Sequence, residues 1–296
     1  CAGKGLRTVI FVPQSTPEGK LAQILIHGAR VYAVRGSYDD AFELAMQASA
    51  EFGWYNRNTG VNPYTREGKK TAAFEICEQL SSGAGEQLGL PSLGSEGARE
   101  TDALPLSYGS PAPRLMQAPD VLIVPVGDGN IIAGLHKGFK DLQTLGWLDQ
   151  MPRIYGIQAE NSAAIANAFQ NHTENIEAVQ ATTVADSISV DFPRDGVRAL
   201  RAATQTGGAY LTVTDAEIIA AIAGLGPHGI FAEPAGAAAF AGYRKALSTG
   251  VISPESPALV INTGSGLKDV RAAMQAVALA PIVAPDLQAL KKVLGY

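Results

Sequence analysis

A short glycine-rich segment follows the most apolar stretch of the sequence and could bind a phosphate group. Residues 121–126 are Val-Leu-Ile-Val-Pro-Val, and Gly127, Asp128, Gly129 and Asn130 come directly after them, before a helical pattern. Backbone N–H groups at the start of a helix bind oxyanions, and glycine allows a close approach because it has no Cβ. The glycine spacing matches neither the dinucleotide-binding fingerprint nor the Walker motif. A phosphate loop and a simple tight turn are both consistent with this segment.

Two further segments place small or polar residues where a ligand could lie. Thr263 belongs to the segment Asn262–Gly266 that follows the apolar run 258–261, and Glu233 opens the segment Glu233–Gly236. Ligands of open α/β sheets bind beyond the carboxyl ends of the strands, so Thr263 and the glycine segment could face one crevice. For the segment that contains Thr263, the structural alternative is a plain glycine-rich turn. For the segment that begins at Glu233, it is a helix whose small residues only allow close packing against neighbouring elements.

A polar loop in the first quarter of the chain could hold a small polar substrate. Residues 56–63 contain three asparagines, Arg57 and Thr59, and the charged segment 67–71 follows. Amide and hydroxyl groups offer such a substrate both hydrogen-bond donors and acceptors. A solvated turn is the alternative interpretation of the same residues.

These candidate segments lie between short apolar runs and helical patterns that alternate along the chain. Such alternation is typical of an α/β fold, in which helices cover a mostly parallel sheet, and we expect that fold here. Capping signals at Thr16, Ser37 and Thr214 predict three helix starts. The continuous apolar run 121–126 predicts a central strand that is buried on both faces. The expected strands are 8–13, 31–34, 54–56, 121–126, 154–157 and 258–261.

The middle of the chain contains a long segment without regular structure in its pattern. A helical pattern covers residues 67–80, and glycines and prolines without a sustained period follow over residues 81–118. We therefore expect a long loop or insertion at 81–118.

Composition and charge exclude several classes of function. The chain has 296 residues, 46% of them hydrophobic and 17% charged, and its net charge is −5. It has no basic cluster that would bind nucleic acid, and no apolar run of the roughly 18 residues that cross a membrane. Cys1 and Cys77 form neither a disulfide framework nor a metal motif, which favours a cytoplasmic location. The four histidines have no metal-ligand spacing, and we expect His136 on the surface of its helix.

In order along the chain, these motifs resemble those of the threonine synthase family, pyridoxal phosphate (PLP) enzymes of fold type II. The resemblance covers nearly the whole chain apart from residues 81–118. It implies two open, mostly parallel α/β sheets, with a smaller domain over residues 1–65 and a larger PLP-binding domain over residues 66–296. The family-like segments are Asn56–Gly60, Asn62–Tyr64, Glu67–Thr71, Val126–Asn130, Ala185–Val190, Phe231–Gly236 and Thr263–Asp269.

The resemblance also implies a cofactor, a reaction and a partner. The glycine segment would hold the PLP phosphate through its N–H groups, and Thr263 would hydrogen-bond the pyridine nitrogen with a neutral hydroxyl that moderates the electron sink. The implied lyase reaction converts O-phospho-L-homoserine and water to L-threonine and phosphate, and the family is usually homodimeric. The residues that match the family's cofactor site are Gly127, Asp128, Gly129, Asn130, Thr263 and Glu233, and those that match its substrate site are Asn58 and Thr59.

Two features depart from the family's pattern. No lysine matches the family's Schiff-base lysine, so we identify no catalytic residue and expect that lysine upstream of residue 1, in a longer enzyme. Lys20, for example, is predicted on a surface helix. Thr65 stands where some relatives have an arginine that binds the substrate phosphate. A serine/threonine dehydratase and a catalytically inactive binding protein of the same fold are therefore alternatives.

Overall fold

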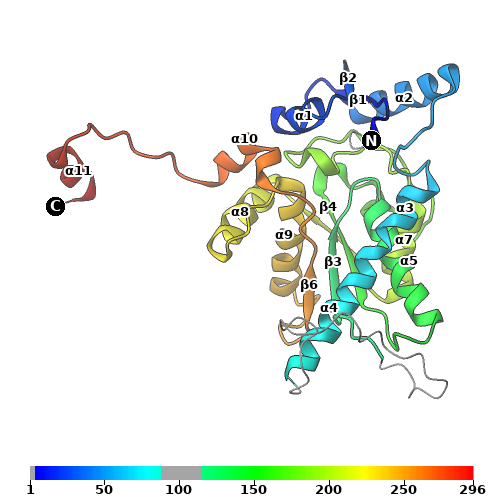
Figure 1. Cartoon of the computed structure of the whole chain (residues 1–296). Helices are drawn as coiled ribbons and strands as arrows, with labels where there is room; N and C mark the ends of the chain where they lie inside the picture. Colours follow the sequence, from blue (N-terminus) through cyan, green and yellow to red (C-terminus); the bar gives the residue numbers. More distant parts are fainter. Residues whose placement is uncertain (1–3, 88–114, 296) are drawn as a thin grey trace, which may run out of the picture.

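The computed structural model describes residues 4–87 and 115–295, in which two separate parallel β-sheets are packed with helices (Figure 1). Strands β1 and β2 form a two-stranded sheet, and the larger sheet has the order β5-β4-β3-β6. All neighbouring strands are parallel, so the predicted α/β fold with mostly parallel sheets is confirmed. The strands are β1 (Val9–Pro13), β2 (Arg30–Val34), β3 (Val121–Pro125), β4 (Arg153–Ala159), β5 (Tyr210–Val213) and β6 (Ala258–Val260).

The helices alternate with these strands and cover both faces of the larger sheet (Figure 1). The last of them, α11, lies away from the sheets at the end of an extended segment (Figure 1). The α-helices are α1 (Glu18–Leu25), α2 (Tyr38–Phe52), α3 (Pro63–Lys69), α4 (Thr71–Gln87), α5 (Asn130–Thr144), α6 (Ala164–Gln170), α7 (Gly196–Thr206), α8 (Asp215–Leu225), α9 (Pro234–Ser248), α10 (Val270–Ala273) and α11 (Leu287–Leu294).

Strand β3 lies at the centre of the larger sheet and is buried on both faces, as its continuous apolar run predicts. Val121 and Ile123 pack in a core with residues of α8 and α9. Leu122 and Val124 point to the opposite face and pack in a second core with residues of α5 and α7. Because side chains alternate along a strand, four consecutive residues supply both cores.

Local capping signals set the start of two long helices where the sequence predicts them. Ser37 and Asp40 form a capping box at the start of α2, and Thr214 and Glu217 form one at α8. Each serine or threonine hydroxyl accepts a backbone N–H that would otherwise lack a partner, which ties the helix start to one residue.

Two predicted elements are wrong. Residues 54–56 form no strand, because the side chain of Asn62 donates to the carbonyl oxygen of Asn56 at 2.9 Å and holds this segment in a loop. The single helix expected over residues 67–80 is divided, because α3 ends at Lys69 and α4 begins at Thr71 and continues to Gln87. The Ser81 hydroxyl donates to the carbonyl oxygen of Cys77 at 2.6 Å, so this serine is accommodated within the helix. Residues 88–114 of the expected loop lie outside the described residues, and the domain boundary at residue 65 stays a prediction.

Two kinds of feature are absent from the described ranges. No helix of residues 4–87 and 115–295 is long and apolar enough to cross a membrane. Within the same ranges, no group of three or more histidine, cysteine, aspartate or glutamate side chains is arranged to hold a metal ion.

Candidate active site

A cavity of about 610 Å³ lies at the carboxyl ends of β1 and β3. Its lining includes Phe11–Pro13 from the end of β1 and Pro125–Ile132, which runs from the end of β3 into α5. Segments far apart in the sequence complete the wall, among them part of α1 and the 3₁₀ turn Asp186–Ile188. The cavity brings together every residue predicted to contact the cofactor, namely Gly127, Asp128, Gly129, Asn130, Thr263 and Glu233.

The glycine segment Gly127–Asn130 forms one end of the cavity, which we call the glycine-loop end. Gly129 has a φ of 86°, and a Cβ there would lie 2.6 Å from the Cβ of Ala199, so the position requires glycine. Among the described residues, the backbone N–H groups of Gly127, Asp128 and Gly129 have no hydrogen-bond acceptor. These donors, at the N-terminus of α5, suit an anion with several acceptor oxygens.

The carboxylate of Asp128 binds groups outside the glycine loop. Its Oδ2 accepts from the Tyr38 hydroxyl at 2.8 Å, and its Oδ1 accepts from the backbone N–H of Arg194 at 3.2 Å. Burial raises the pKa of Asp128, and burial together with the nearby Asp128 carboxylate raises the pKa of Tyr38. The side chain of Asp128 therefore links the loop to α2, and its backbone N–H remains available to donate to a ligand.

Asn130 is buried below the loop and connects it to charged side chains. Its Oδ1 accepts from the Lys69 ammonium, and its Nδ2 donates to the carboxylate of Asp195. Asp195 also accepts from Arg66 and from Arg198, at 2.8 Å in each case. The Asn130 amide thus has protein partners on both sides, and Lys69 is held against the cavity wall.

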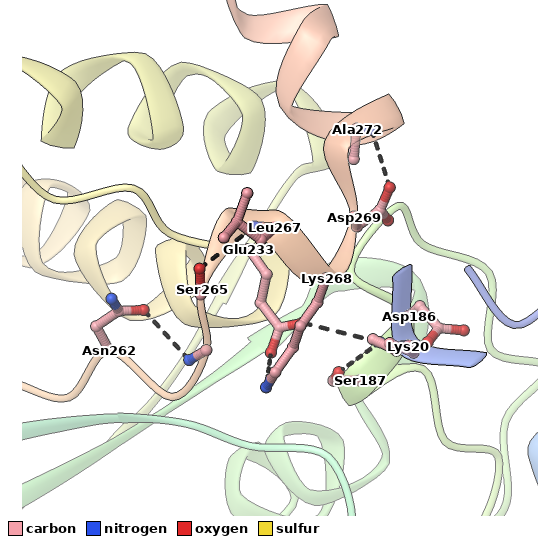
Figure 2. A network of polar contacts seen from close by, with 11 residues as sticks. Lys20, Asp186, Ser187, Glu233, Asn262, Ser265, Leu267, Lys268, Asp269 and Ala272 are labelled. Carbon is pink, nitrogen blue, oxygen red and sulfur yellow. Dashed lines mark hydrogen bonds and ion pairs between the residues drawn. The ribbon is translucent and has the colours of Figure 1, made fainter. Parts of the chain in front are cut away.

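Another part of the cavity, which we call the Glu233 end, holds a carboxylate between two lysines (Figure 2). Glu233 is 3% exposed, and its oxygens lie 3.4 Å from the Lys268 Nζ and 3.8 Å from the Lys20 Nζ. Lys20 also donates to Asp186 at 2.6 Å and to the Ser187 hydroxyl at 2.8 Å. The carboxylates at this end therefore balance the charge of both lysines.

Thr263 lies beside this ion-pair cluster and lines the cavity. The next residue must be glycine, because a Cβ on Gly264 would lie 2.0 Å from a carboxylate oxygen of Glu233. The side chain of Asn262 accepts the Gly264 N–H at 3.4 Å (Figure 2). These contacts fix the turn that presents the Thr263 hydroxyl.

The two predicted substrate residues differ in position. Thr59 lines the cavity, whereas Asn58 is not among its lining residues. The backbone of Asn58 builds the turn instead: its N–H donates to the Asn56 side chain at 2.7 Å, and its carbonyl oxygen accepts from Val61 and Asn62. A substrate contact by Thr59 or Asn58 stays a prediction.

The structure corrects two expectations and adds a residue. Lys20 lies on a helix, but its side chain is only 18% exposed and lines the cavity, because it pairs with carboxylates of distant segments. His136 is also buried, since α5 packs against both α3 and α4, and burial lowers its pKa to about 4. Lys69 lines the cavity without any predicted role. The sequence feature that could have indicated Lys69 is its position inside the family-like segment Glu67–Thr71.

Comparison with known proteins supports the resemblance that the motifs indicate. The profile of the family described as Pyridoxal-phosphate dependent enzyme matches residues 1–89 and 104–264. A threonine synthase of Methanocaldococcus jannaschii is 34% identical over 99% of this chain, and one of Halalkalibacterium halodurans is 33% identical over 96%. The chain spans 64% of the length of the first relative and 69% of the second.

Solved structures of other enzymes share the fold. Threonine deaminase isoform 2 from Solanum lycopersicum matches 92% of this chain and 67% of its own, with a TM-score of 0.64 and 19% identity. Diaminopropionate ammonia lyase from Escherichia coli matches 95% of this chain and 67% of its own, with a TM-score of 0.67 and 17% identity. With a profile match over most of its length and threonine synthases as relatives, the chain belongs to the family of pyridoxal-phosphate dependent enzymes of fold type II.

Proposed function

We propose that the chain carries the cofactor and substrate site of a threonine synthase, a lyase that converts O-phospho-L-homoserine and water to L-threonine and phosphate. The main structural support is one cavity that is lined both by the glycine loop, whose N–H groups have no acceptor among the described residues, and by Thr263. Threonine synthases at 34% and 33% identity favour this reaction over the dehydratase alternative, because the deaminase and ammonia-lyase neighbours share only 19% and 17%.

The residues of the cavity fit PLP. A volume of about 610 Å³ suits a small cofactor together with an amino acid. The N–H groups of Gly127, Asp128 and Gly129 would donate to the phosphate, and the Thr263 hydroxyl would bind the ring nitrogen. When bound, PLP supplies the electron sink that the loss of the Cα and Cβ protons and of the γ-phosphate requires.

Other residues of this chain would orient the reactants. Thr59 would contact the substrate from the polar loop. The Glu233 carboxylate would keep Lys20 and Lys268 in place beside the ring. The homodimer, the amino-acid substrate and the cytoplasmic location stay predictions, and so does the position of the Schiff-base lysine.

Turnover of three amino acids tests the proposal, measured with PLP on this chain and on a longer chain that extends upstream of residue 1, where the Schiff-base lysine is predicted. O-phospho-L-homoserine should yield phosphate and L-threonine in equal amounts, whereas L-serine and L-threonine should yield no 2-oxo acid. Release of a 2-oxo acid from L-threonine would instead support the dehydratase alternative. Specific binding of O-phospho-L-homoserine to the loaded longer chain without any product would support an inactive binding protein, whereas product from the longer chain alone would place the Schiff-base lysine in the upstream segment.

A further inference from the structure

Lys69 is held in a fixed position at the glycine-loop end of the cavity. It is the last residue of α3, and its ammonium donates to Asn130, the first residue of α5. The two helices approach closely, because a Cβ on Gly134 would lie 2.6 Å from the Cβ of Lys69. The Lys69 backbone therefore has little freedom, and its partly buried side chain lines the cavity beside the loop.

The charge of Lys69 is not balanced by a directly bonded carboxylate. Among the ion pairs of residues 4–87 and 115–295, none includes Lys69. Of the two nearby acids, Asp195 is bound by Arg66 and Arg198, and Asp128 accepts from a tyrosine hydroxyl and a backbone N–H. The Asn130 amide is therefore the bonded partner of this ammonium, and an amide carries no charge.

Such an arrangement is costly without an anion. Withdrawing an ammonium from water is unfavourable unless an opposite charge or a set of hydrogen bonds compensates it. Burial, the largest effect, lowers the pKa of Lys69 even though Asp195 and Asp128 raise it, and the nearby Arg57 also lowers it. A dianion at the loop would accept hydrogen bonds from the N–H groups of the loop and would also balance the positive charge of the Lys69 ammonium.

We propose that Lys69 binds a phosphate monoester together with the glycine loop, an inference that rests on the proposed function. The phosphate has two possible sources, the cofactor and the substrate. The contact of Lys69 with Asn130 places its charge next to the loop that would hold the cofactor phosphate. Lys69 also follows the polar loop of Thr59, and both residues line one cavity. Lys69 would then supply positive charge in a chain that has Thr65 where some relatives have arginine.

Binding of ligand pairs that differ only in phosphate tests this role without requiring turnover. The first pair is pyridoxine 5′-phosphate and pyridoxine, which have no aldehyde and so bind without a lysine bond. The second pair is O-phospho-L-homoserine and L-homoserine, each titrated into protein saturated with pyridoxine 5′-phosphate. Equilibrium dialysis gives the dissociation constant of each ligand. We call the dissociation constant of the ligand without phosphate, divided by that of its phosphorylated partner, the phosphate increment.

Three variants of the full chain separate charge from packing. K69Q keeps the Cβ that packs on α5 and removes the charge, and K69R keeps the charge. K70Q is the matched control, because it removes the same charge one residue away. Lys70 pairs with Glu67 and Asp141 and does not line the cavity. Thermal unfolding by circular dichroism checks that each variant folds.

K69Q should lower the phosphate increment of one ligand pair about 10- to 100-fold, the effect of losing one charge-assisted hydrogen bond. K69R and K70Q should change it less than about threefold. A loss in the first pair assigns the phosphate to the cofactor, and a loss in the second assigns it to the substrate. Unchanged increments in K69Q, with wild-type binding intact, would overturn the role of Lys69 and leave the proposed function standing. Failure of the wild-type chain to bind either phosphate ligand would overturn both.

Discussion

The two ends of the cavity differ in how the charge of their lysines is balanced. At the Glu233 end, Lys20 and Lys268 both lie within 4 Å of one buried carboxylate. At the glycine-loop end, Lys69 contacts the neutral amide of Asn130 and forms no ion pair with a described residue. At the Glu233 end, protein carboxylates therefore balance the lysine charges. At the glycine-loop end, an anion would balance the charge of Lys69 and accept hydrogen bonds from the backbone N–H groups.

A second cavity shows why balance, and not the number of basic residues, distinguishes the two ends. This cavity of about 490 Å³ is lined by three arginines, and each of them pairs with a carboxylate. Its charges are thus already compensated within the protein, and it gives no reason to expect an anion. The pairs are Arg194–Asp39, Arg198–Asp195 and Arg201–Glu174.

The largest expected effect comes from replacing the glycine that shapes the loop. Gly129→Ala would force a non-glycine residue to a φ of 86° and bring its Cβ to 2.6 Å from Ala199. We expect a loss of about 3 kcal/mol in the free energy of unfolding, from backbone strain and overpacking together. Urea unfolding measures this loss, and binding of pyridoxine 5′-phosphate should weaken by more than about tenfold because the donors move.

Gly146→Ala is the matched control for this strain. Gly146 has a φ of 72°, but a Cβ there would meet no atom within 4 Å. We expect a loss of only about 1 kcal/mol and unchanged binding. If Gly129→Ala and Gly146→Ala weakened pyridoxine 5′-phosphate binding equally, the glycine loop would not be the anion-binding end.

The next effect tests the end that is already balanced. Glu233→Ala removes the carboxylate shared by Lys20 and Lys268, and both lysines are partly shielded from water. We expect the free energy of unfolding to fall by about 2 kcal/mol, measured by urea unfolding. The phosphate increment of pyridoxine 5′-phosphate should stay within about twofold of wild type, since the glycine-loop end is unchanged.

Glu233→Gln separates the shape of this side chain from its charge. Because the amide can still accept from one lysine, the loss of stability should be about 1 kcal/mol. A large fall of the phosphate increment in either Glu233 variant would mean that the two ends act as one site, and the contrast between them would be wrong.

The fold was predictable where the signal is local. The run 121–126 indicates a doubly buried strand because apolar residues occupy both faces, and the capping boxes at Ser37 and Thr214 involve residues three apart. Strand β5 (Tyr210–Val213) was missed because four residues carry too little periodicity. The burial of His136 was missed as well, since it depends on helices that the sequence alone does not place on α5.

The candidate site divides in the same way. The glycine loop and Thr263 directly follow strands of one parallel sheet, whose carboxyl ends share an edge, so the sequence alone indicates that they face one crevice. Lys20 and Lys69 were not predicted, because their partners Asp186 and Asn130 are distant in sequence and become neighbours only in the folded chain. Sequence motifs therefore identified the backbone segments that line the cavity. Which lysines line the same cavity depends on tertiary contacts.

The smallest expected effect is a pH dependence of phosphate binding at the glycine-loop end. Burial and Arg57 lower the pKa of Lys69, while Asp195 and Asp128 act in the opposite direction. A bound phosphate favours the charged ammonium and raises that pKa again, so affinity is full below the pKa of the free protein. If K69Q assigns the phosphate to the cofactor, affinity for pyridoxine 5′-phosphate should fall by up to about tenfold as pH rises through this pKa, below the range of an ordinary lysine; if it assigns the phosphate to the substrate, affinity for O-phospho-L-homoserine should fall instead.

The K69R variant decides whether Lys69 causes this fall. Arginine stays charged throughout the measured range, so the alkaline fall should disappear in K69R and persist in K70Q. Pyridoxine, which has no phosphate, should show no comparable fall with the wild-type protein, and titrations from neutral to alkaline pH give all four curves. An alkaline fall that persisted in K69R would assign the titrating group elsewhere, and the unpaired lysine would no longer distinguish the glycine-loop end from the Glu233 end.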